Sequence, residues 1–569
     1  MTGRKLSSAV LLQAAILALE LAAISLPAPS QAATAGDSAV ASGKRIYLEG
    51  MLPSNLPLHG LREGQGEVVG AMAACVSCHR RSGLGSFEGN SVIPPITDKY
   101  LRRSATTNTN DVDMGHVQGY RQNHVAYTDS TLARSIRTGV ASDGRTLSVL
   151  MPRYALDEVA MQDLLAYLGQ LGTGAAPGVS DTTLQFATII TPDADPVERE
   201  AMLAVMQRFF ANQTAVIAAE TRPMKSSREI AYRVTRQWRL HVWELVGAQD
   251  SWTKQLHDHM TAEPVFAILS GLGRSNWKPV HQFCESNHVP CLFPNIDVPA
   301  SNDGDFYTAY FSRGVFLEAD LLAQWLAGSS GQESRHRRLV QVYRQDDAGF
   351  AGAAALRTAT SAMNWEVLDR PVSAHAGSKA LSEALAGIQS GDLLMLWLRP
   401  TDLKSLPPQP PSHMVLASGL MGGLESAPFP AAWRKSVHMA YPVDLPERRV
   451  PRMNFPYGWF KVQHIPITAE RIQIDTYLAC VIASETVGGV FDNFVPDFLV
   501  ERLEMMVGRR LTSAYFPHLG LAPGQRFASK GGFIVHFADD PSPIGVADAT
   551  DSRSTRPMRV IADGDWITP

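Results

Sequence analysis

The sequence predicts a multidomain protein in which a smaller N-terminal domain precedes a large two-lobe α/β domain. The chain has 569 residues, too many for a single hydrophobic core. Residues 172–181, with the sequence GTGAAPGVSD, are small and polar, as in a linker. Beyond them, short β-rich runs alternate with helical patterns. We expect a signal peptide at 1–32, a first domain at 38–172, a linker at 173–183, an α/β domain at 184–540 and a polar C-terminal tail at 541–569.

The N-terminus has the features of an export signal. Arg4 and Lys5 precede an apolar run, and residues 27–32 (PAPSQA) then supply small residues for a signal peptidase. A retained membrane anchor is the alternative, but Gln13 and Glu20 interrupt the apolar run and are costly in lipid. No later stretch is long and apolar enough to span a bilayer. We therefore expect a periplasmic protein with no membrane span after signal cleavage.

The overall composition is that of a globular protein with few charges. Apolar residues make up 45% of the chain and charged residues 19%. The formal net charge is −4, so the chain lacks the basic footprint of a nucleic-acid-binding protein. We expect no nucleic-acid partner.

The α/β domain is predicted from strands and helices that alternate along the chain. Near-continuous apolar strands separated by helices are typical of parallel sheets covered on both faces. At about 350 residues the region is too long for one such sheet, which favours two lobes. The expected strands are 186–190, 241–246, 265–269, 339–343, 393–397 and 413–417, and the clearest helical segments are 197–210, 315–326 and 352–363.

Cys75, Cys78 and His79 form a Cys-x-x-Cys-His motif that predicts a covalent haem site. Two thiols three residues apart on one turn can add to the two vinyl groups of haem, and the next histidine is placed to bind the iron. A thioredoxin-like pair would follow a strand in a βαβ pattern, and a structural zinc site would need a second Cys or His pair. Neither context is present, so we expect one covalently bound haem c.

The predicted sixth ligand of the iron is Met151. A methionine sulfur or a second imidazole normally fills this position in an electron carrier. Met151 lies between the haem motif and a predicted terminal helix at residues 157–171, which favours ligation over a plain core methionine. The other candidates, Met114, His116 and His124, lie in a polar insertion.

The three remaining cysteines predict no extensive disulfide framework. Cys284 and Cys291 flank what reads as a helix end turning into a strand. They are either a disulfide or two small buried hydrophobic residues, because sequence does not show whether their Cα atoms lie within bonding reach. We expect Cys480 to be a packed core thiol.

Residues 43–171 resemble a class I cytochrome c. The matching features are GKRIY at 43–47, the haem motif, GLG at 83–85, PPI at 94–96, IRTG at 136–139, DGR at 143–145, MPRY at 151–154 and LAYL at 165–168. The resemblance implies a small all-α domain with one haem ligated by His79 and Met151. It also implies that a carbonyl at Pro94 or Pro95 accepts the second N–H of the His79 ring. The segment from 98 to 125 is longer than is usual in that family.

Residues 184–537 more weakly resemble periplasmic solute-binding proteins of the branched-chain amino acid type. SGLGRS at 270–275 follows a strand and opens a helix, and RLVQVY at 338–343 with Asp346 and Asp347 resembles the turn that starts the second lobe. The resemblance implies two lobes joined by hinge strands, with a small-molecule ligand in the cleft. Ser275, and with it Ser270, would then face the cleft.

These features together predict a periplasmic c-type cytochrome. One haem would transfer electrons to or from a redox partner, a dehydrogenase or an oxidase, while the second domain binds a small molecule or docks the partner. Two alternatives stay open: a solute-binding or sensor protein of the ABC-transporter type with an accessory haem, and a haem-linked oxidoreductase. The chain lacks a nucleophile elbow, a P-loop and a metal helix, so we expect no substrate turnover of its own.

Overall fold

The computed structural model describes residues 35–88, 91–104, 125–173, 176–220, 236–274, 276–329, 338–363, 365–490, 493–508, 513–539 and 557–569. The predicted signal peptide lies outside them, as do Met114, His116, His124 and Ser275. The chain forms two compact units. The described part of the first comprises residues 35–79, 95–104 and 125–173, and the second comprises 80–88, 91–94 and the described residues from 176 onward. Among the described residues, no helix combines the length and the apolar composition that a membrane span requires.

The first unit is built around two long helices, α2 (Ala35–Glu49) and α6 (Glu158–Gln170). Gly43 lets them approach closely, because a Cβ at this position would lie 2.0 Å from the carbonyl oxygen of Asp163. The rings of Tyr47 and Tyr167 pack 5.3 Å apart across the same interface. Three shorter helices complete the unit: α3 (Val76–His79), α4 (Asp98–Leu101) and α5 (Asp129–Thr138). The predicted terminal helix is thus confirmed as α6, with Asp157 as its N-cap.

The expectation of an all-α first domain is wrong, because this unit also contains a small antiparallel sheet. Its strands are β1 (His59–Arg62), β2 (Gly66–Val69) and β5 (Arg153–Tyr154), in the order β2-β1-β5. Gly64 and Gly66 have positive φ angles, which allows the tight turn between β1 and β2. Sequence patterning missed these strands because each has at most four residues.

The first sheet of the second unit is parallel throughout and has seven strands. The order is β11-β9-β6-β8-β10-β12, and β7 also pairs with β6 along its whole length, outside this path. Its strands are β6 (Thr183–Ile190), β7 (Gln237–Glu244), β8 (Ala267–Leu269), β9 (Leu272–Gly273), β10 (Cys291–Leu292), β11 (Asn295–Ile296) and β12 (Thr308–Ala309). Helices α7 (Pro196–Glu220), α8 (Trp252–Ala262) and α9 (Lys278–Ser286) connect the strands. We call this sheet with its helices the first lobe.

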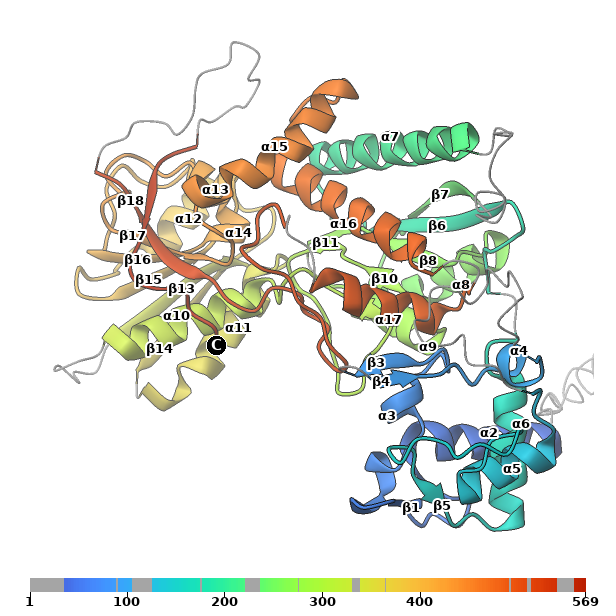
Figure 1. Cartoon of the computed structure of the whole chain (residues 1–569). Helices are drawn as coiled ribbons and strands as arrows, with labels where there is room; N and C mark the ends of the chain where they lie inside the picture. Colours follow the sequence, from blue (N-terminus) through green and yellow to red (C-terminus); the bar gives the residue numbers. More distant parts are fainter. Residues whose placement is uncertain are drawn as a thin grey trace, which may run out of the picture. The chain divides into compact units, whose positions relative to one another are not determined.

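The second sheet has the order β14-β13-β15-β16-β17-β18-β19. Its strands are β13 (Arg338–Arg344), β14 (Glu366–Val372), β15 (Leu393–Trp397), β16 (Met414–Ser418), β17 (Val437–Tyr441), β18 (Phe533–Phe537) and β19 (Val560–Ala562). Its helices are α10 (Val315–Ser329), α11 (Gly349–Ala359), α12 (Ser378–Leu385), α13 (Pro400–Leu403) and α14 (Gly419–Gly422). Helices α10 and α11 lie on one face and α12 to α14 on the other (Figure 1). We call this part the second lobe.

Alternating burial explains why the strands of the second lobe read as continuous apolar runs. Leu339 packs with the α10 and α11 side, whereas its neighbour Val340 packs with the opposite face. Leu393 and Leu394 divide in the same way. The expected strands and helices of the α/β domain are confirmed within a few residues at their ends, except that α7 continues ten residues beyond the predicted end at 210. The polar tail expected from residue 541 is wrong in part, because β19 pairs with β18 and extends the sheet.

The chain passes between the two lobes three times: from β12 into α10, from β17 into α15 (Pro446–Val462), and from α17 (Pro496–Val507) back to β18. Helix α16 (Glu470–Gly488) packs against α7, β8 and β11, so the chain returns to the first lobe before it completes the second (Figure 1). The two-lobe α/β architecture is therefore confirmed.

The residues directly after the Cys-x-x-Cys-His motif belong to the second unit, within the boundaries predicted for the first domain. They include the hairpin of β3 (Ser86–Glu88) and β4 (Ser91–Ile93). Buried Ser82 donates from its backbone N–H and its hydroxyl to the carboxylate of Glu501 on α17, at 2.9 and 2.5 Å. Arg80 pairs with Glu504 at 3.0 Å.

Candidate functional site

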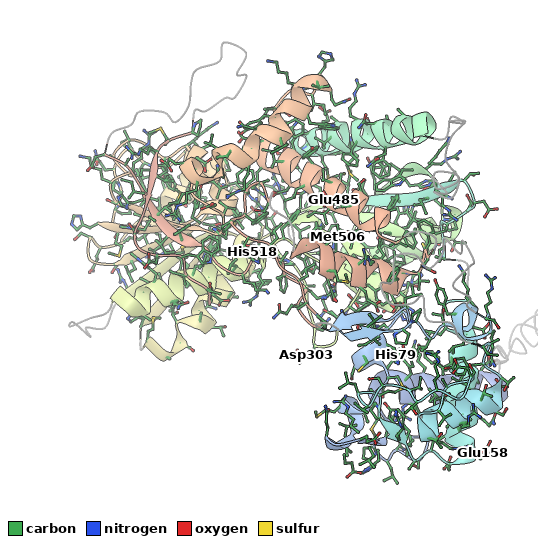
Figure 2. The ribbon with its side chains drawn as sticks, viewed as in Figure 1. His79, Glu158, Asp303, Glu485, Met506 and His518 are labelled. Atoms are coloured by element: carbon green, nitrogen blue, oxygen red, sulfur yellow. The ribbon has the colours of Figure 1, made fainter. Side chains whose placement is uncertain are left out.

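The Cys-x-x-Cys-His motif folds into a single helical turn. The backbone N–H groups of Cys78 and His79 both donate to the carbonyl of Cys75, at 3.2 and 2.9 Å. Cys75 and Cys78 are half-buried thiols that form no disulfide, and burial raises the pKa of Cys75 to about 12. His79 is the last residue of α3 (Figure 2). The turn therefore groups the three predicted haem ligands as the motif requires.

Met151 lies in a loop that Arg153 holds in place. The Arg153 guanidinium donates to the carbonyl of Met151 at 2.5 Å, and also reaches the carbonyls of Leu147 and Ser148 at 3.3 and 3.4 Å. Gly139, at the C-terminus of α5, leaves space for this guanidinium, because a Cβ there would lie 2.0 Å from it. The loop conformation is thus set by hydrogen bonds from the Arg153 guanidinium to the backbone carbonyls of the loop.

Tyr154 connects the Met151 loop to the cysteine turn. Its hydroxyl donates to the carbonyl of Ala73 at 2.8 Å, two residues before Cys75. Burial, together with the nearby thiols of Cys75 and Cys78, raises the pKa of the Tyr154 hydroxyl. The structure therefore brings residues 151–154 and 73–79, which are far apart in sequence, to one place in the first unit.

The residues present fit a covalently bound haem. The donor set comprises two thiols and an imidazole on one turn, with a thioether on a neighbouring, pre-shaped loop. Val149 and Leu150, which directly precede Met151, are 47% and 42% exposed. Cys75, Cys78, His79 and Met151 stay the predicted haem residues.

A small cavity lies between the two lobes of the second unit. Its volume is about 30 Å³, room for one or two water molecules. The first lobe contributes Asn295 and Asp297 at the end of β11, and α16 contributes Arg471 and Asp475. Leu420, from the second lobe, closes the other side. We call this the inner cavity.

Two polar atoms that line the inner cavity have no hydrogen-bond partner. They are Oδ1 of Asn295 and Oδ1 of Asp475, and each residue is only 5% exposed. Arg471 lies 3.6 Å from Asp475 and 4.0 Å from Asp297, longer than a close ion pair. Burial raises the pKa of Asp475 to about 7, although Arg471 opposes the shift. Buried acceptors without partners are rare and indicate a site built for a ligand or for water.

A second, wider cavity of about 700 Å³ opens between the lobes. Its walls include Asp193 and Trp252 from the first lobe and Asp347 and Phe350 from the second. Arg399 separates it from the inner cavity by pairing with Asp347 at 2.6 Å and with Asp297 at 2.7 Å. We call it the outer cavity.

Ser270, predicted to face the cleft, instead lies beneath it. The side chain is fully buried and accepts a hydrogen bond from the Asn295 amide at 3.0 Å. The Asn295 amide also donates to Thr476 at 3.0 Å, so both donors of this side chain are used and its oxygen stays unpaired. Sequence reasoning missed Asn295, Arg471 and Asp475 because the last two come from a helix almost two hundred residues later in the chain.

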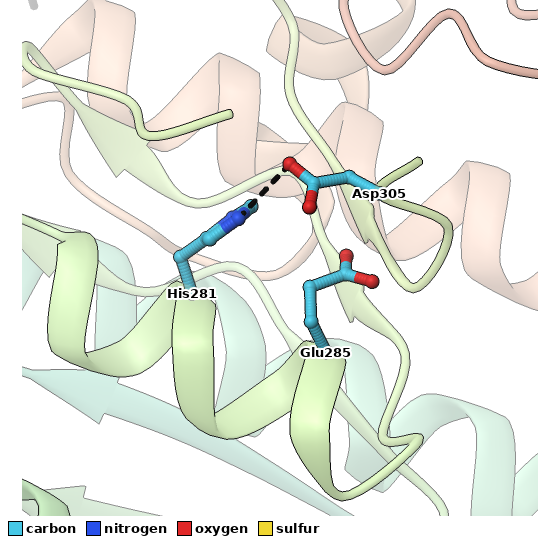
Figure 3. A group of neighbouring side chains, drawn as sticks. All are labelled: His281, Glu285 and Asp305. Atoms are coloured by element: carbon cyan, nitrogen blue, oxygen red, sulfur yellow. Dashed lines mark ion pairs between the residues drawn. The ribbon is translucent and has the colours of Figure 1, made fainter. Parts of the chain in front are cut away.

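His281, Glu285 and Asp305 form a further cluster, with ligand-type atoms within 4.8 Å of one another (Figure 3). Hydrogen bonds within the protein explain why these three side chains lie together. The Glu285 carboxylate accepts from the backbone N–H groups of Phe306, Tyr307 and Thr308 and from the Thr308 hydroxyl, at 2.8 to 3.2 Å. This uses all four of its acceptor sites, so the cluster braces the loop before β12.

The second unit is similar to solved structures of ABC transporter binding proteins. One is a fatty acid ABC transporter substrate-binding protein from Thermomonospora curvata, with 15% identity and a TM-score of 0.48, covering 70% of this chain and 95% of that one. Another is a solute-binding protein from Rhodopseudomonas palustris BisB5 in complex with 3,4-dihydroxybenzoic acid, with 11% identity, a TM-score of 0.48 and coverages of 68% and 98%. A third is a branched-chain amino acid ABC transporter protein from Thermus thermophilus with bound valine, with 11% identity, a TM-score of 0.46 and coverages of 68% and 97%.

No protein-family model matches the chain, and no curated protein matches it. The prediction that electron transfer is the main function is corrected by the structural similarities, because the matching structures are ABC transporter binding proteins. The fold is defined by the two sheets and the three connections between them.

Proposed function

We propose that this is an exported solute-binding protein of the ABC-transporter type, which binds a small polar solute between its two lobes and holds an accessory haem on its N-terminal domain. The main support is the inner cavity, where the buried oxygens of Asn295 and Asp475 have no partner. Buried acceptors without partners are costly unless a ligand or water supplies the missing donors.

The lining selects the chemistry of the solute. Both unpartnered atoms accept hydrogen bonds, so the solute supplies donors to them. Arg471, which is only loosely paired, supplies donors to an oxygen of the solute. A small hydroxy- or amino-carboxylate provides both kinds of group. The inner cavity has room for only one or two water molecules, so the lobes must separate to admit a solute of this kind; the outer cavity, which has the size of a typical ligand pocket, gives access to it.

A thermal-shift screen of small amino acids, hydroxy acids and alcohols tests the proposal. A solute that binds the native state raises the thermal midpoint with its concentration. Arg471→Gln and Asn295→Ala should weaken binding of that solute by about 10- to 100-fold. The matched control is Arg313→Gln, because Arg313 pairs with Asp320 at the surface. A solute bound equally by wild type and Arg471→Gln would place the site elsewhere, and a screen without any shift would reject this class of solute.

The accessory haem is attached through Cys75 and Cys78 and ligated by His79, with Met151 as the second axial ligand. Support comes from the two thiols on one turn and from Tyr154, whose hydroxyl joins the Met151 loop to the segment just before that turn. When bound, the haem supplies a redox-active iron. Acid–acetone extraction should leave the haem on the chain, whereas Cys75→Ala and Cys78→Ala should weaken its attachment. Cys480→Ala is the control, because Cys480 is a buried core thiol. Pigment released from the wild-type protein would reject covalent attachment.

A further inference from the structure

Cys284 and Cys291 lie together in the core of the first lobe. Both are free and fully buried, and they share one hydrophobic cluster with Trp277 and Phe283. Cys284 is on α9 and Cys291 is the first residue of β10. The sequence left open whether these two residues come within reach of each other.

The backbone at the end of α9 brings them close. The helix ends with His288 in the left-handed conformation, at a φ of 55°, and the Val289 N–H donates back to the carbonyl of Cys284 at 2.9 Å. This six-to-one hydrogen bond is the mark of a Schellman motif, which ends the helix. Strand β10 begins two residues after Val289, at Cys291, and Cys291 packs in the same hydrophobic cluster as Cys284.

Within this cluster the two thiols influence each other. Burial, and after it the interaction with Cys291, raises the pKa of Cys284. A raised thiol pKa keeps the nucleophilic thiolate scarce in the folded protein. Thiol chemistry at this pair is therefore slow once the lobe has folded, and it is easiest while the chain is folding.

We propose that Cys284 and Cys291 form a disulfide bond in the exported protein. Two S–H bonds are broken and one S–S bond forms, and two electrons and two protons pass to a disulfide-bearing thiol oxidase by thiol–disulfide exchange. The inference rests on the proposed export, because such bonds form and persist in oxidising compartments. It does not depend on solute binding.

The bond has a structural consequence for the wall of the cleft. It fixes α9 to β10, and so fixes Glu285, whose carboxylate holds the loop that leads into β12. Tyr310 and Phe311, which follow β12, line the inner cavity. The disulfide thus anchors one side of the proposed solute site.

Peptide mapping of the full-length protein from the periplasm tests the bond. Free thiols are alkylated in denaturant at harvest, and the chain is then cleaved after glutamate. Cleavage at Glu285 falls between the two cysteines, so their peptides stay joined only if a disulfide links them. The expected result is a linked pair that separates on reduction. Peptides alkylated separately at Cys284 and Cys291, or a link from either one to Cys480, would overturn the proposal.

Thermal unfolding with and without a reductant gives a second measurement. Reduction should lower the midpoint of the wild type by several degrees and leave the Cys284→Ala/Cys291→Ala double variant unchanged. Cys480→Ala is the matched control and should keep the reductant sensitivity. Reduced protein partly unfolded in urea should form the bond with oxidised glutathione faster than folded protein does. If the disulfide does not form under these conditions, the pairing of Cys284 with Cys291 is rejected, whether or not the protein is exported. Loss of solute binding alone does not contradict the pairing.

Discussion

The guanidinium of Arg399 in the second lobe lies 2.7 Å from the carboxylate of Asp297 in the first. The same guanidinium pairs with Asp347 at 2.6 Å, so one side chain joins a carboxylate from each lobe. Although burial opposes it, Arg399 lowers the pKa of Asp347 and keeps that carboxylate charged. Asp297 lines the inner cavity and Asp347 the outer one, so this ion triad stands between the two cavities and joins the lobes.

Arg399→Met should destabilise the α/β domain by about 3–5 kcal/mol, because it leaves two buried carboxylates facing each other without a cation. The measurement is urea unfolding followed by tryptophan fluorescence. Lys254→Met is the control: Lys254 pairs with Asp258 on the surface, where an ion pair contributes less than about 1 kcal/mol. Equal effects of the two substitutions would show that the triad does not hold the lobes together.

Asp475 should make the stability of the domain pH-dependent. Burial raises the pKa of this carboxyl from 3.8 to about 7, so between these values the folded state binds more protons than the unfolded state. The free energy of unfolding therefore falls as pH rises through this window and levels off above it. Relative to Asp475→Asn, the wild type should lose on the order of 2–4 kcal/mol between pH 4 and 8.

The measurement for Asp475 is the difference between the two unfolding free energies as a function of pH. Taking the difference removes the contribution of other buried carboxyls, such as Glu318 and Glu501, whose pKa values burial also raises. Asp258→Asn is the control, since Asp258 is 62% exposed. A flat difference between wild type and Asp475→Asn would contradict the raised pKa.

The α/β order was predictable from sequence because its strands are long apolar runs with helices between them. β15 was predicted at its observed bounds, since all five residues are buried. The small strands β1, β2 and β5 were not predictable, because they depend on glycine turns and on pairing across the chain. Cys75, Cys78 and His79 were visible because their chemistry needs adjacent residues. Asn295 and Asp475 were invisible because only tertiary folding brings them together.

Arg153→Ala should loosen the Met151 loop, because three carbonyls lose their donor. In haem-loaded protein, the weak sulfur-to-iron absorption should decrease and the first unit should lose about 1–3 kcal/mol of stability. Gly139→Ala should act in the same direction, since its Cβ would displace the Arg153 guanidinium. Arg145→Ala, on an exposed turn with Asp143, is the control. An unchanged absorption in Arg153→Ala would show that the loop keeps its shape without this residue.

Ser82→Ala should destabilise the second unit by about 1–3 kcal/mol, because the buried Glu501 carboxylate loses the hydroxyl that donates to it at 2.5 Å. Burial already raises the pKa of Glu501 to about 7, so loss of this donor should raise it further. Urea unfolding at pH 8 gives the largest effect, since Glu501 is then mostly charged. Ser77→Ala is the control, as the Ser77 hydroxyl donates only to the exposed carbonyl of Ala71.

Two glycines in the first unit should respond in opposite directions to the same substitution. Gly43→Ala places a Cβ 2.0 Å from the backbone carbonyl of Asp163, and a backbone atom in a packed helix cannot turn aside. Helices α2 and α6 must therefore separate, which weakens the contact between Tyr47 and Tyr167 and costs about 1–3 kcal/mol or more.

Gly169→Ala is the matched change, on α6, with no atom within 4 Å of the added Cβ. It should stabilise the unit by up to about 1 kcal/mol, because alanine has the higher helix propensity. Differential scanning calorimetry of the full chain gives both effects as shifts of the transition of the first unit. Because each glycine lies in that unit, the transition of the α/β domain should not move. If Gly43→Ala were tolerated as well as Gly169→Ala, the close approach of α2 and α6 would be wrong, and with it the packing that closes the core of the first unit.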